Sequence, residues 1–321
     1  MQPARTYLQI VGGFCILNAL IPICSSYLRA FGFSKEPLYA SIIGNVINFC
    51  LNAFFLFVLH KGVAGVATAT VISRIINLVI VVLLGAVLVK AKQHPERESN
   101  RAVMGQIIRI GLPSACETAI YNVSMTLVIR FLNQMDAQGL NVTARSYTMQ
   151  ITNFSYCVGA ALAQANAIMT GWHIGAKEYD ACDRGTKKAA VIGVIVAVIL
   201  ETVFTLCSGW IMQLFSKDPQ MVSLVGKLLA IDIVLEIGRV TNLVYGQALK
   251  TSGDAVFPVV MGACFMILCS VGGTYLFGIR LGLLAVGAYI GMTGDECVRA
   301  VGMYLRWKSG KWKEKGLVKS R

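Results

Sequence analysis

Nine long apolar segments, separated by short polar stretches, most constrain what this chain can fold into. A helix that crosses a bilayer needs about 20 predominantly apolar residues, and each segment reaches that length. Only 14% of the residues are charged, against about 25% in soluble domains, which excludes an ordinary water-soluble domain. The sequence therefore predicts an all-α polytopic membrane protein with nine transmembrane helices. They are expected at about residues 6–27, 37–58, 64–90, 108–132, 142–170, 186–210, 221–247, 255–278 and 282–305.

The basic residues between these segments predict the orientation of the chain. The net charge of +13 would suit a nucleic-acid-binding protein if the charges shared one face, but they lie between the apolar segments. Sorted by loop, 19 Lys and Arg fall on one side of the membrane and 4 on the other. Because cytoplasmic loops carry the excess of Lys and Arg, we expect a cytoplasmic C-terminus and no nucleic-acid partner.

A weak internal repeat predicts two lobes. Residues 28–44 resemble 248–262, and residues 62–68 resemble 282–288, at offsets of 218 and 220. Such a spacing indicates a parallel duplication about an axis along the membrane normal. The second copy has six spans and the first has three, so we expect three spans to be lacking before Met1. The expected parts are a partial N-lobe at 1–90, a cytoplasmic linker at 91–107, a C-lobe at 108–308 and a basic cytoplasmic tail at 309–321.

Charged side chains inside apolar segments are the candidate site residues, because such charges are costly in hydrocarbon and usually face a cavity or a partner. Glu117 follows Pro113 by one turn in the fourth segment. Asp232, Glu236 and Arg239 are spaced i, i+4 and i+7, so they share one helix face, and Glu236 with Arg239 is expected to form an i, i+3 ion pair. For each carboxylate, binding of an ion or substrate and a purely structural ion pair or hydrogen bond are both open.

Further polar residues predict a gate and the walls of a cavity. Asp295 and Arg299, an i, i+4 pair late in the last segment, are expected to act as a gate or latch near the headgroups. Stripes of amide and hydroxyl side chains either line cavities or form hydrogen bonds between helices, and cavity lining is favoured here. The expected lining residues are Asn45, Asn48, Asn52, Tyr121, Asn122, Gln164, Asn166 and Asn242.

Several blocks resemble the MATE family of multidrug and toxin extrusion transporters in their order and spacing. They are 110–117 (IGLPSACE), 159–166 (GAALAQAN), 171–176 (GWHIGA), 235–242 (LEIGRVTN) and 306–312 (RWKSGKW). Family members have twelve spans in two six-span lobes, so the resemblance implies the fourth to twelfth. It further implies a monomeric antiporter of the plasma membrane, which exports small amphipathic organic cations in exchange for Na⁺ or H⁺ by alternating access. For Glu117, it favours a role in coupling.

Three alternatives are weighed against this function. A lipid-linked saccharide exporter of the same superfamily would need a larger cationic cavity for phosphate. A truncated product that transports nothing is the second alternative. An integral-membrane transferase is disfavoured, because the chain has no paired-aspartate motif and its three histidines lie at loops or helix ends. No catalytic residue, metal site or cofactor other than the coupling ion is therefore expected.

Overall fold

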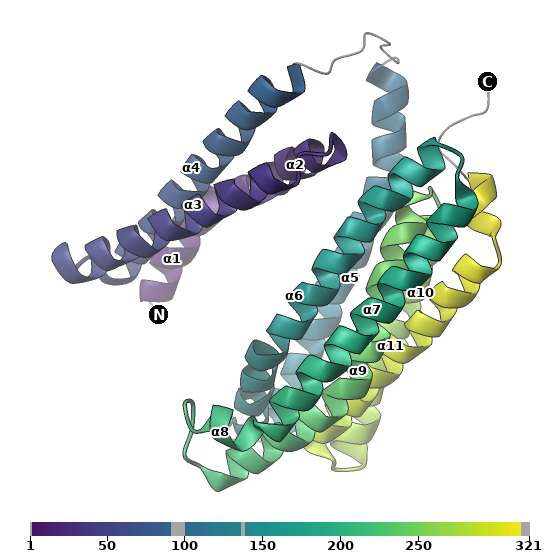
Figure 1. Cartoon of the computed structure of the whole chain (residues 1–321). Helices are drawn as coiled ribbons and strands as arrows, with labels where there is room; N and C mark the ends of the chain where they lie inside the picture. The colour runs from purple at the N-terminus through teal and green to yellow at the C-terminus, as the bar shows by residue number, and fades with distance from the viewer. Residues whose placement is uncertain (1, 91–99, 136–138, 316–321) are drawn as a thin grey trace. The chain divides into compact units, whose positions relative to one another are not determined.

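The computed structural model describes residues 2–90, 100–135 and 139–315, and within these ranges the chain is helical with no strand. This confirms the predicted all-α class. The chain divides into two compact units, Met1–Arg97 and Glu98–Arg321. The helices of each unit are labelled in Figure 1.

The amino-terminal unit contains four helices around a small core. Its elements are α1 (Gln2–Gly13), α2 (Leu17–Ala30), α3 (Lys35–Ala53), the π-helical continuation η1 (Phe54–Val58) and α4 (Gly62–Lys90). Leu28 of α2, Ala40 of α3 and Val81 of α4 are buried together. Between membrane helices such contacts contribute van der Waals packing, because lipid tails are as apolar as these side chains.

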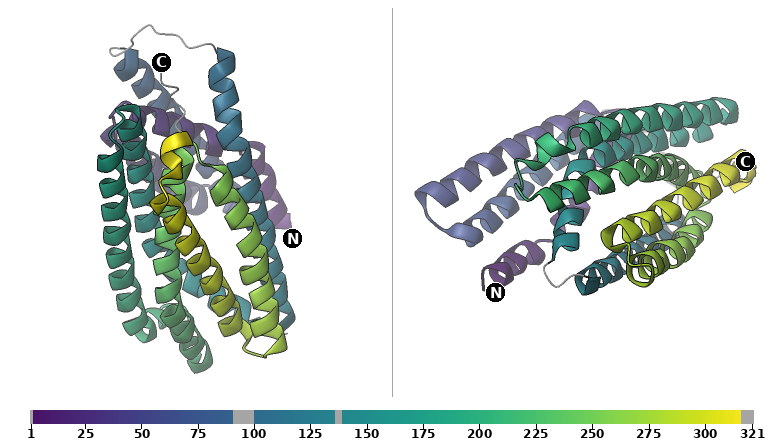
Figure 2. Two further views of the ribbon diagram at one scale, coloured as in Figure 1. Left: turned by 90° about the vertical axis from the view of Figure 1, so that its right-hand side faces the viewer. Right: turned by 90° about the horizontal axis from the view of Figure 1, so that it is seen from below.

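The carboxyl-terminal unit is built from long helices that lie side by side in both views of Figure 2. Two buried apolar clusters hold α6, α7, α9 and α11 together. The elements are α5 (Asn100–Met135), α6 (Leu140–Gly175), α7 (Tyr179–Leu206), α8 (Ser208–Met212), α9 (Pro219–Thr251), α10 (Val256–Phe265), η2 (Met266–Val271), η3 (Thr274–Arg280), α11 (Leu284–Lys308) and η4 (Lys311–Lys315).

Only part of the predicted set of spans is independently supported by length and hydropathy. Among the described residues, four helices pass as candidate spans, or five if the bent pair α1 and α2 forms one. The four are Lys35–Val58, Gly62–Val89, Tyr179–Leu206 and Val256–Arg280. Helices α9 and α11, which are not among them, carry buried charged residues: Asp232 and Glu236 on α9, and Asp295, Glu296 and Arg299 on α11. The count of nine spans stays a prediction.

The boundary predicted for the linker differs from the structure at one end. Helix α5 begins at Asn100, so residues 100–107 are helical, whereas the sequence assigns them to the linker. The remainder of the predicted linker, 91–99, lies outside the described residues. The predicted tail contains the 3-10 helix η4, and its residues 316–321 also lie outside the described part.

Gly238 brings α9 and α11 into close contact. A Cβ atom at this position would lie 2.9 Å from both the backbone nitrogen of Cys297 and the carbonyl carbon of Glu296. Backbone atoms cannot move aside as a flexible side chain can, so only glycine permits this approach. The contact places the next residue of α9, Arg239, beside Glu296 of α11.

We expect Gly238→Ala to lower the free energy of unfolding by about 1–3 kcal/mol, the usual cost of overpacking, even though alanine is the better helix former. Gly294→Ala is the matched control, because a Cβ there meets no atom within 4 Å. The thermal midpoints of both purified variants measure the difference. Equal midpoints for the two variants would contradict the close approach.

A buried carboxylate joins the end of α9 to the C-terminal segment. Gly253, with φ +91°, turns the chain after α9, and the next residue, Asp254, has a fully buried side chain. Its two carboxylate oxygens accept hydrogen bonds from Arg306 Nε at 2.6 Å and Lys315 Nζ at 2.7 Å. Burial raises the pKa of Asp254, but the hydrogen bonds and charges of Arg306 and Lys315 outweigh it and lower the pKa below its ordinary value.

We expect Asp254→Asn to lower the free energy of unfolding by about 2 kcal/mol at neutral pH, the usual scale of charge-assisted hydrogen bonds. Because the folded-state pKa is depressed, the carboxylate's contribution is complete above the unfolded pKa of about 4 and is lost as the pH falls through the folded value. Thermal midpoints of the wild type and the variant should therefore converge below about pH 4. A difference between them that persists at low pH would contradict this account.

Candidate functional site

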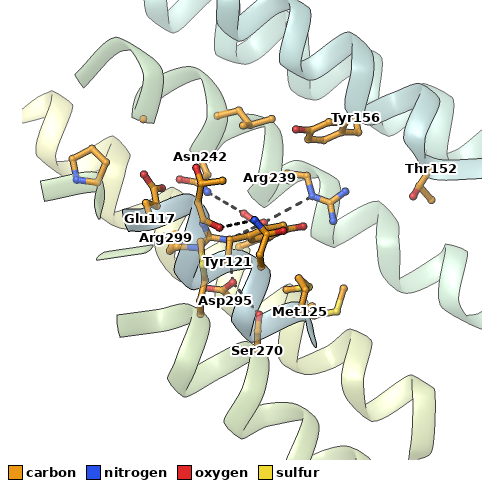
Figure 3. A pocket seen from close by; sticks show the side chains of 18 of the residues that line it. Glu117, Tyr121, Met125, Thr152, Tyr156, Arg239, Asn242, Ser270, Asp295 and Arg299 are labelled. Atoms are coloured by element: carbon orange, nitrogen blue, oxygen red, sulfur yellow. Dashed lines mark hydrogen bonds and ion pairs between the residues drawn. The ribbon is translucent and has the colours of Figure 1, made fainter. Parts of the chain in front are cut away.

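A cavity of about 550 Å³ lies within the carboxyl-terminal unit. Helices α5, α6, α9 and α11 contribute most of its wall, and η2 contributes Met266 and Ser270. Figure 3 shows side chains from these helices directed toward one another around it. The volume falls within the range of about 300–1,000 Å³ typical of small-molecule pockets.

A chain of ion pairs runs from α9 to α11 along this cavity. Arg239 forms an ion pair with Glu236, as the i, i+3 spacing predicts, and its Nε lies 3.8 Å from Glu296 Oε1. Asn242 donates a hydrogen bond of 3.0 Å to the other oxygen of Glu296. Arg239 is also 6.0 Å from the ring centre of Tyr156 on α6, within reach of a cation–π contact. Glu236 itself is fully buried.

The same chain continues through Arg299 of α11. Its guanidinium contacts Asp295 through two hydrogen bonds, of 2.8 and 3.0 Å, and lies 2.8 Å from Glu296. Ser270 donates a hydrogen bond of 2.9 Å to Asp295. The predicted pair of Asp295 and Arg299 is therefore formed, and both residues are buried and line the cavity. Their role as a gate or latch stays a prediction.

Glu117 makes an ion pair that connects α5 with α9. Its Oε2 lies 2.6 Å from Nζ of Lys250, and both side chains line the cavity. The carboxylate therefore has a cationic partner that its own helix could not supply. A cation that binds Glu117 would have to displace Lys250 or share the carboxylate with it.

Three buried carboxylates converge beside the ion-pair chain. One oxygen each from Glu201 of α7, Asp232 and Glu236 lie within 4.8 Å of one another. In the part of the chain that the structure describes, both oxygens of Glu201, Oδ2 of Asp232 and Oε2 of Glu236 are buried without a hydrogen-bond partner. Buried polar atoms are normally satisfied, so these four oxygens require an explanation.

The other predicted lining residues of the carboxyl-terminal unit lie in three different places. Tyr121, Asn122 and Asn242 line the cavity, and Gln164 lines a second cavity of about 350 Å³. Asn166 is buried between α6 and α7, where it donates a hydrogen bond to Thr186 Oγ1 at 3.3 Å. Its placement indicates packing rather than a cavity wall.

The asparagines of the amino-terminal unit form hydrogen bonds within and between helices. Asn48 donates to Ser73 Oγ on α4 at 3.1 Å, and Asn52 donates to Asn48 at 3.0 Å. Asn45 is exposed. Bonds between helices were the alternative to cavity lining for this stripe, and they account for Asn48 and Asn52.

Four residues of the site are absent from the predicted set: Arg145, Glu201, Lys250 and Glu296. Arg145 of α6 is buried at the cavity, where it donates a bond to Met125 Sδ, and its Nε lacks a hydrogen-bond partner among the described residues. Three of the four, Arg145, Glu201 and Glu296, are charges inside predicted apolar segments. The cost of a charge in hydrocarbon is therefore the signal that would have found them.

Comparison with known proteins agrees with the family resemblance. The family model described as MatE matches residues 113–276. The "Uncharacterized transporter YisQ" of Bacillus subtilis is 33% identical over 99% of this chain and 71% of its own length. The "Probable multidrug resistance protein NorM" of Thermotoga maritima is 21% identical over 98% of this chain and 68% of its own length.

Solved structures show the same fold. A MATE protein crystallised in the straight conformation superposes with a TM-score of 0.84 at 18% identity, covering 96% of this chain and 70% of that chain. An outward-facing multidrug resistance MATE transporter gives the same TM-score, over 97% of this chain and 71% of that chain. From the family model, the relative in Bacillus subtilis and this fold, the chain belongs to the MatE family of multidrug and toxin extrusion transporters.

Proposed function

We propose that this efflux transporter is an antiporter, which exports small amphipathic organic cations in exchange for Na⁺ or H⁺ by alternating access. The observation that carries the proposal is the continuous ion-pair chain of Glu236, Arg239, Glu296, Arg299 and Asp295 along a cavity. Charges in a membrane helix are retained at a large energetic cost. A coupling site is a function that requires them.

Coupling follows because the entering cation and Arg239 compete for the same carboxylates. An entering cation neutralises carboxylate charge near Arg239 and weakens the hold of Glu236 and Glu296 on its guanidinium. Because the contacts of Arg239 join α9 to α11, such a change alters how these helices are held together. A ligand that favours one arrangement of two shifts the population toward it. Cation entry and substrate release thereby become linked steps.

The lining of the cavity supports an amphipathic, aromatic substrate. Tyr121 and Tyr156 present partly exposed rings, and Met125, Met149 and Met292 add flexible apolar contacts. Methionine-rich surfaces repack around varied ligands, as an exporter of several compounds requires. Carboxylates such as Asp232 and Glu296, which also line the cavity, supply the attraction for a cationic group.

The remaining expectations form part of the same proposal. The excess of Lys and Arg on one side of the predicted spans supports a cytoplasmic C-terminus, and the plasma membrane is part of the proposal. Apolar side chains such as Ile199 and Leu206 of α7, which are 57% and 80% exposed, would face lipid. We propose a monomer that moves its substrates without chemical change and uses no cofactor beyond the coupling ion.

The test is ethidium transport by purified protein in liposomes. Ethidium should move against its concentration gradient when an opposing gradient of Na⁺ or H⁺ is imposed, and it should stop when ionophores dissipate that gradient. Transport that proceeds only down the ethidium gradient, whichever cation gradient is imposed, would contradict antiport. Failure to transport ethidium and other organic cations would reject the proposal.

A further inference from the structure

Arg145 is a cation in the cavity wall that no carboxylate of the described residues neutralises. The basic residues that line the cavity are Arg145, Arg239, Lys250 and Arg299. The last three each form an ion pair with an acidic residue of the same wall. Arg145 instead donates a bond of 3.6 Å from Nη2 to the thioether sulfur of Met125, which is a weak, neutral acceptor. Its positive charge is therefore left over.

This leftover charge is buried. Arg145 is 6% exposed, and its Nε has no hydrogen-bond partner in the part of the chain that the structure describes. A guanidinium keeps its proton in proteins, so the charge cannot be removed by titration. Burial of an unpaired charge is strongly unfavourable. A bound anion would relieve this cost, and the fork of the guanidinium matches a carboxylate through two parallel hydrogen bonds.

Arg145 begins a stripe of side chains on α6 that faces the cavity. Met149, Thr152 and Tyr156 follow it at i+4, i+7 and i+11, the spacing of one helix face, and all four line the cavity. Thr152 and Tyr156 are seen on this helix in Figure 3. A ligand group held by Arg145 therefore lies on the same wall as an aromatic ring.

Asp232 is the matching leftover anion. Of the four carboxylates that line the cavity, three belong to the ion pairs described above: Glu117, Asp295 and Glu296. Asp232 forms no ion pair among the described residues, and its Oδ2 is buried without a hydrogen-bond partner. Tyr289 of α11 also lines the cavity and lies near enough to Arg145 and Asp232 for both charges to act on it. The wall thus leaves one positive and one negative charge unpaired.

We propose that Arg145 is an anion-binding residue of the substrate site, which takes the carboxylate of an aromatic zwitterion while Asp232 takes its cationic group. This role rests on the proposed efflux function and narrows its substrate class. A zwitterion pairs with both leftover charges and keeps the wall neutral, whereas a permanent cation such as ethidium pairs only with Asp232. A phosphate dianion would exceed the single free cation.

The test is equilibrium binding of two fluorescent dyes to the purified, full chain in detergent, followed by fluorescence anisotropy. Rhodamine B is a cationic xanthylium dye with a free carboxylate, and its ethyl ester is the same cation without that charge. Arg145→Met should weaken binding of rhodamine B at least about tenfold, because hydrogen bonds between charged groups are lost. Binding of the ester should stay within about twofold of the wild-type value.

The matched control is Arg130→Met, which should bind both dyes as wild type does. Arg130 is exposed and is not among the residues that line the cavity. It lies as far from the end of α5 at Met135 as Arg145 lies from the start of α6 at Leu140. Loss of an arginine as such is therefore separated from loss of the charge in the cavity.

A ligand-free measurement separates anion binding from a structural role. Because no carboxylate holds Arg145, the thermal midpoint of Arg145→Met should be no lower than that of wild type. If that variant does not fold, Arg145→Lys, which keeps the charge but loses the fork, should still weaken binding of rhodamine B several-fold and leave the ester unaffected. Stabilisation of wild type by inorganic phosphate as large as that by rhodamine B would show a plain anion site and overturn the proposal.

Other outcomes overturn the role of Arg145 or the proposed function separately. Equal losses for the two dyes, or unchanged affinity for rhodamine B in the folded variants, would reject the anion-binding role. Gradient-driven ethidium antiport alongside either result would leave the proposed function standing. Binding of rhodamine B that depends on Arg145, without gradient-driven transport of any dye, would support the site and reject the function.

Discussion

Replacing Glu236 with glutamine is expected to reduce cation-driven ethidium efflux to the background of protein-free liposomes. Glutamine nearly preserves the shape of the side chain but removes the charge that holds Arg239 and attracts the coupling ion. Among its ion pairs, Arg239 then retains the longer contact of 3.8 Å to Glu296. Because Glu236 is completely buried, water cannot substitute for the lost charge, and the cation and substrate steps should become uncoupled.

The control for this variant is Glu178→Gln, which removes a carboxylate of which 58% is exposed and whose partner is His173. Solvent-exposed pairs of this kind contribute about 0–1 kcal/mol, so its efflux should equal that of wild type. Both variants must give the same gel-filtration profile as wild type before efflux is compared. Efflux at the wild-type rate by a folded Glu236→Gln variant would show that Glu236 has no part in coupling.

The Arg299→Met variant is expected to lose about 3–5 kcal/mol of unfolding free energy, the range observed when one partner of a buried ion pair is removed. Arg299 is 4% exposed and compensates two carboxylates, Asp295 and Glu296. Methionine fills much of the volume of the arginine stem but leaves Asp295 buried without a cation and leaves Glu296 with only the longer contact of 3.8 Å to Arg239. Ser270 and Asn242 supply only neutral hydrogen bonds to them.

Two comparisons separate charge from packing in this prediction. Adding Asp295→Asn to Arg299→Met removes one uncompensated charge and should recover part of the lost stability. Lys187→Met removes the cation of an exposed i, i+4 pair with Asp183 on α7, where solvent screening leaves almost no cost. Reversible unfolding in detergent measures all three variants. A loss for Arg299→Met no larger than that for Lys187→Met would contradict the role given to the buried pair.

Features that depend on short stretches of sequence could be predicted. The pairs Glu236 with Arg239 and Asp295 with Arg299 follow from helix geometry alone, because residues three or four apart lie on the same face. Helical segments follow in the same way from the length of the apolar runs. The exact helix ends could not be predicted in this way. Helix α5 begins at Asn100, and the residues between Asn100 and the apolar segment are polar enough to resemble a linker.

Contacts between distant helices could not be predicted from one sequence. Lys250 is 133 positions from Glu117, and it follows the predicted apolar segment, so it was assigned to a loop. Glu201 of α7 lies near Asp232 of α9, and the two helices pack closely at Gly193, where a Cβ would lie 2.7 Å from Val240 Cγ1. Nothing in the local pattern specifies which helix faces which, and the site depends on that choice.

The most direct test of the central claim, that the buried charges of α9 and α11 couple cation entry to substrate release, is a flux measurement in liposomes with no imposed ion gradient. An ethidium gradient alone should drive ²²Na⁺ or protons in the opposite direction through the wild type, and Glu236→Gln should abolish this counterflow. Ethidium movement without movement of either cation, or equal counterflow through the variant, would contradict the account.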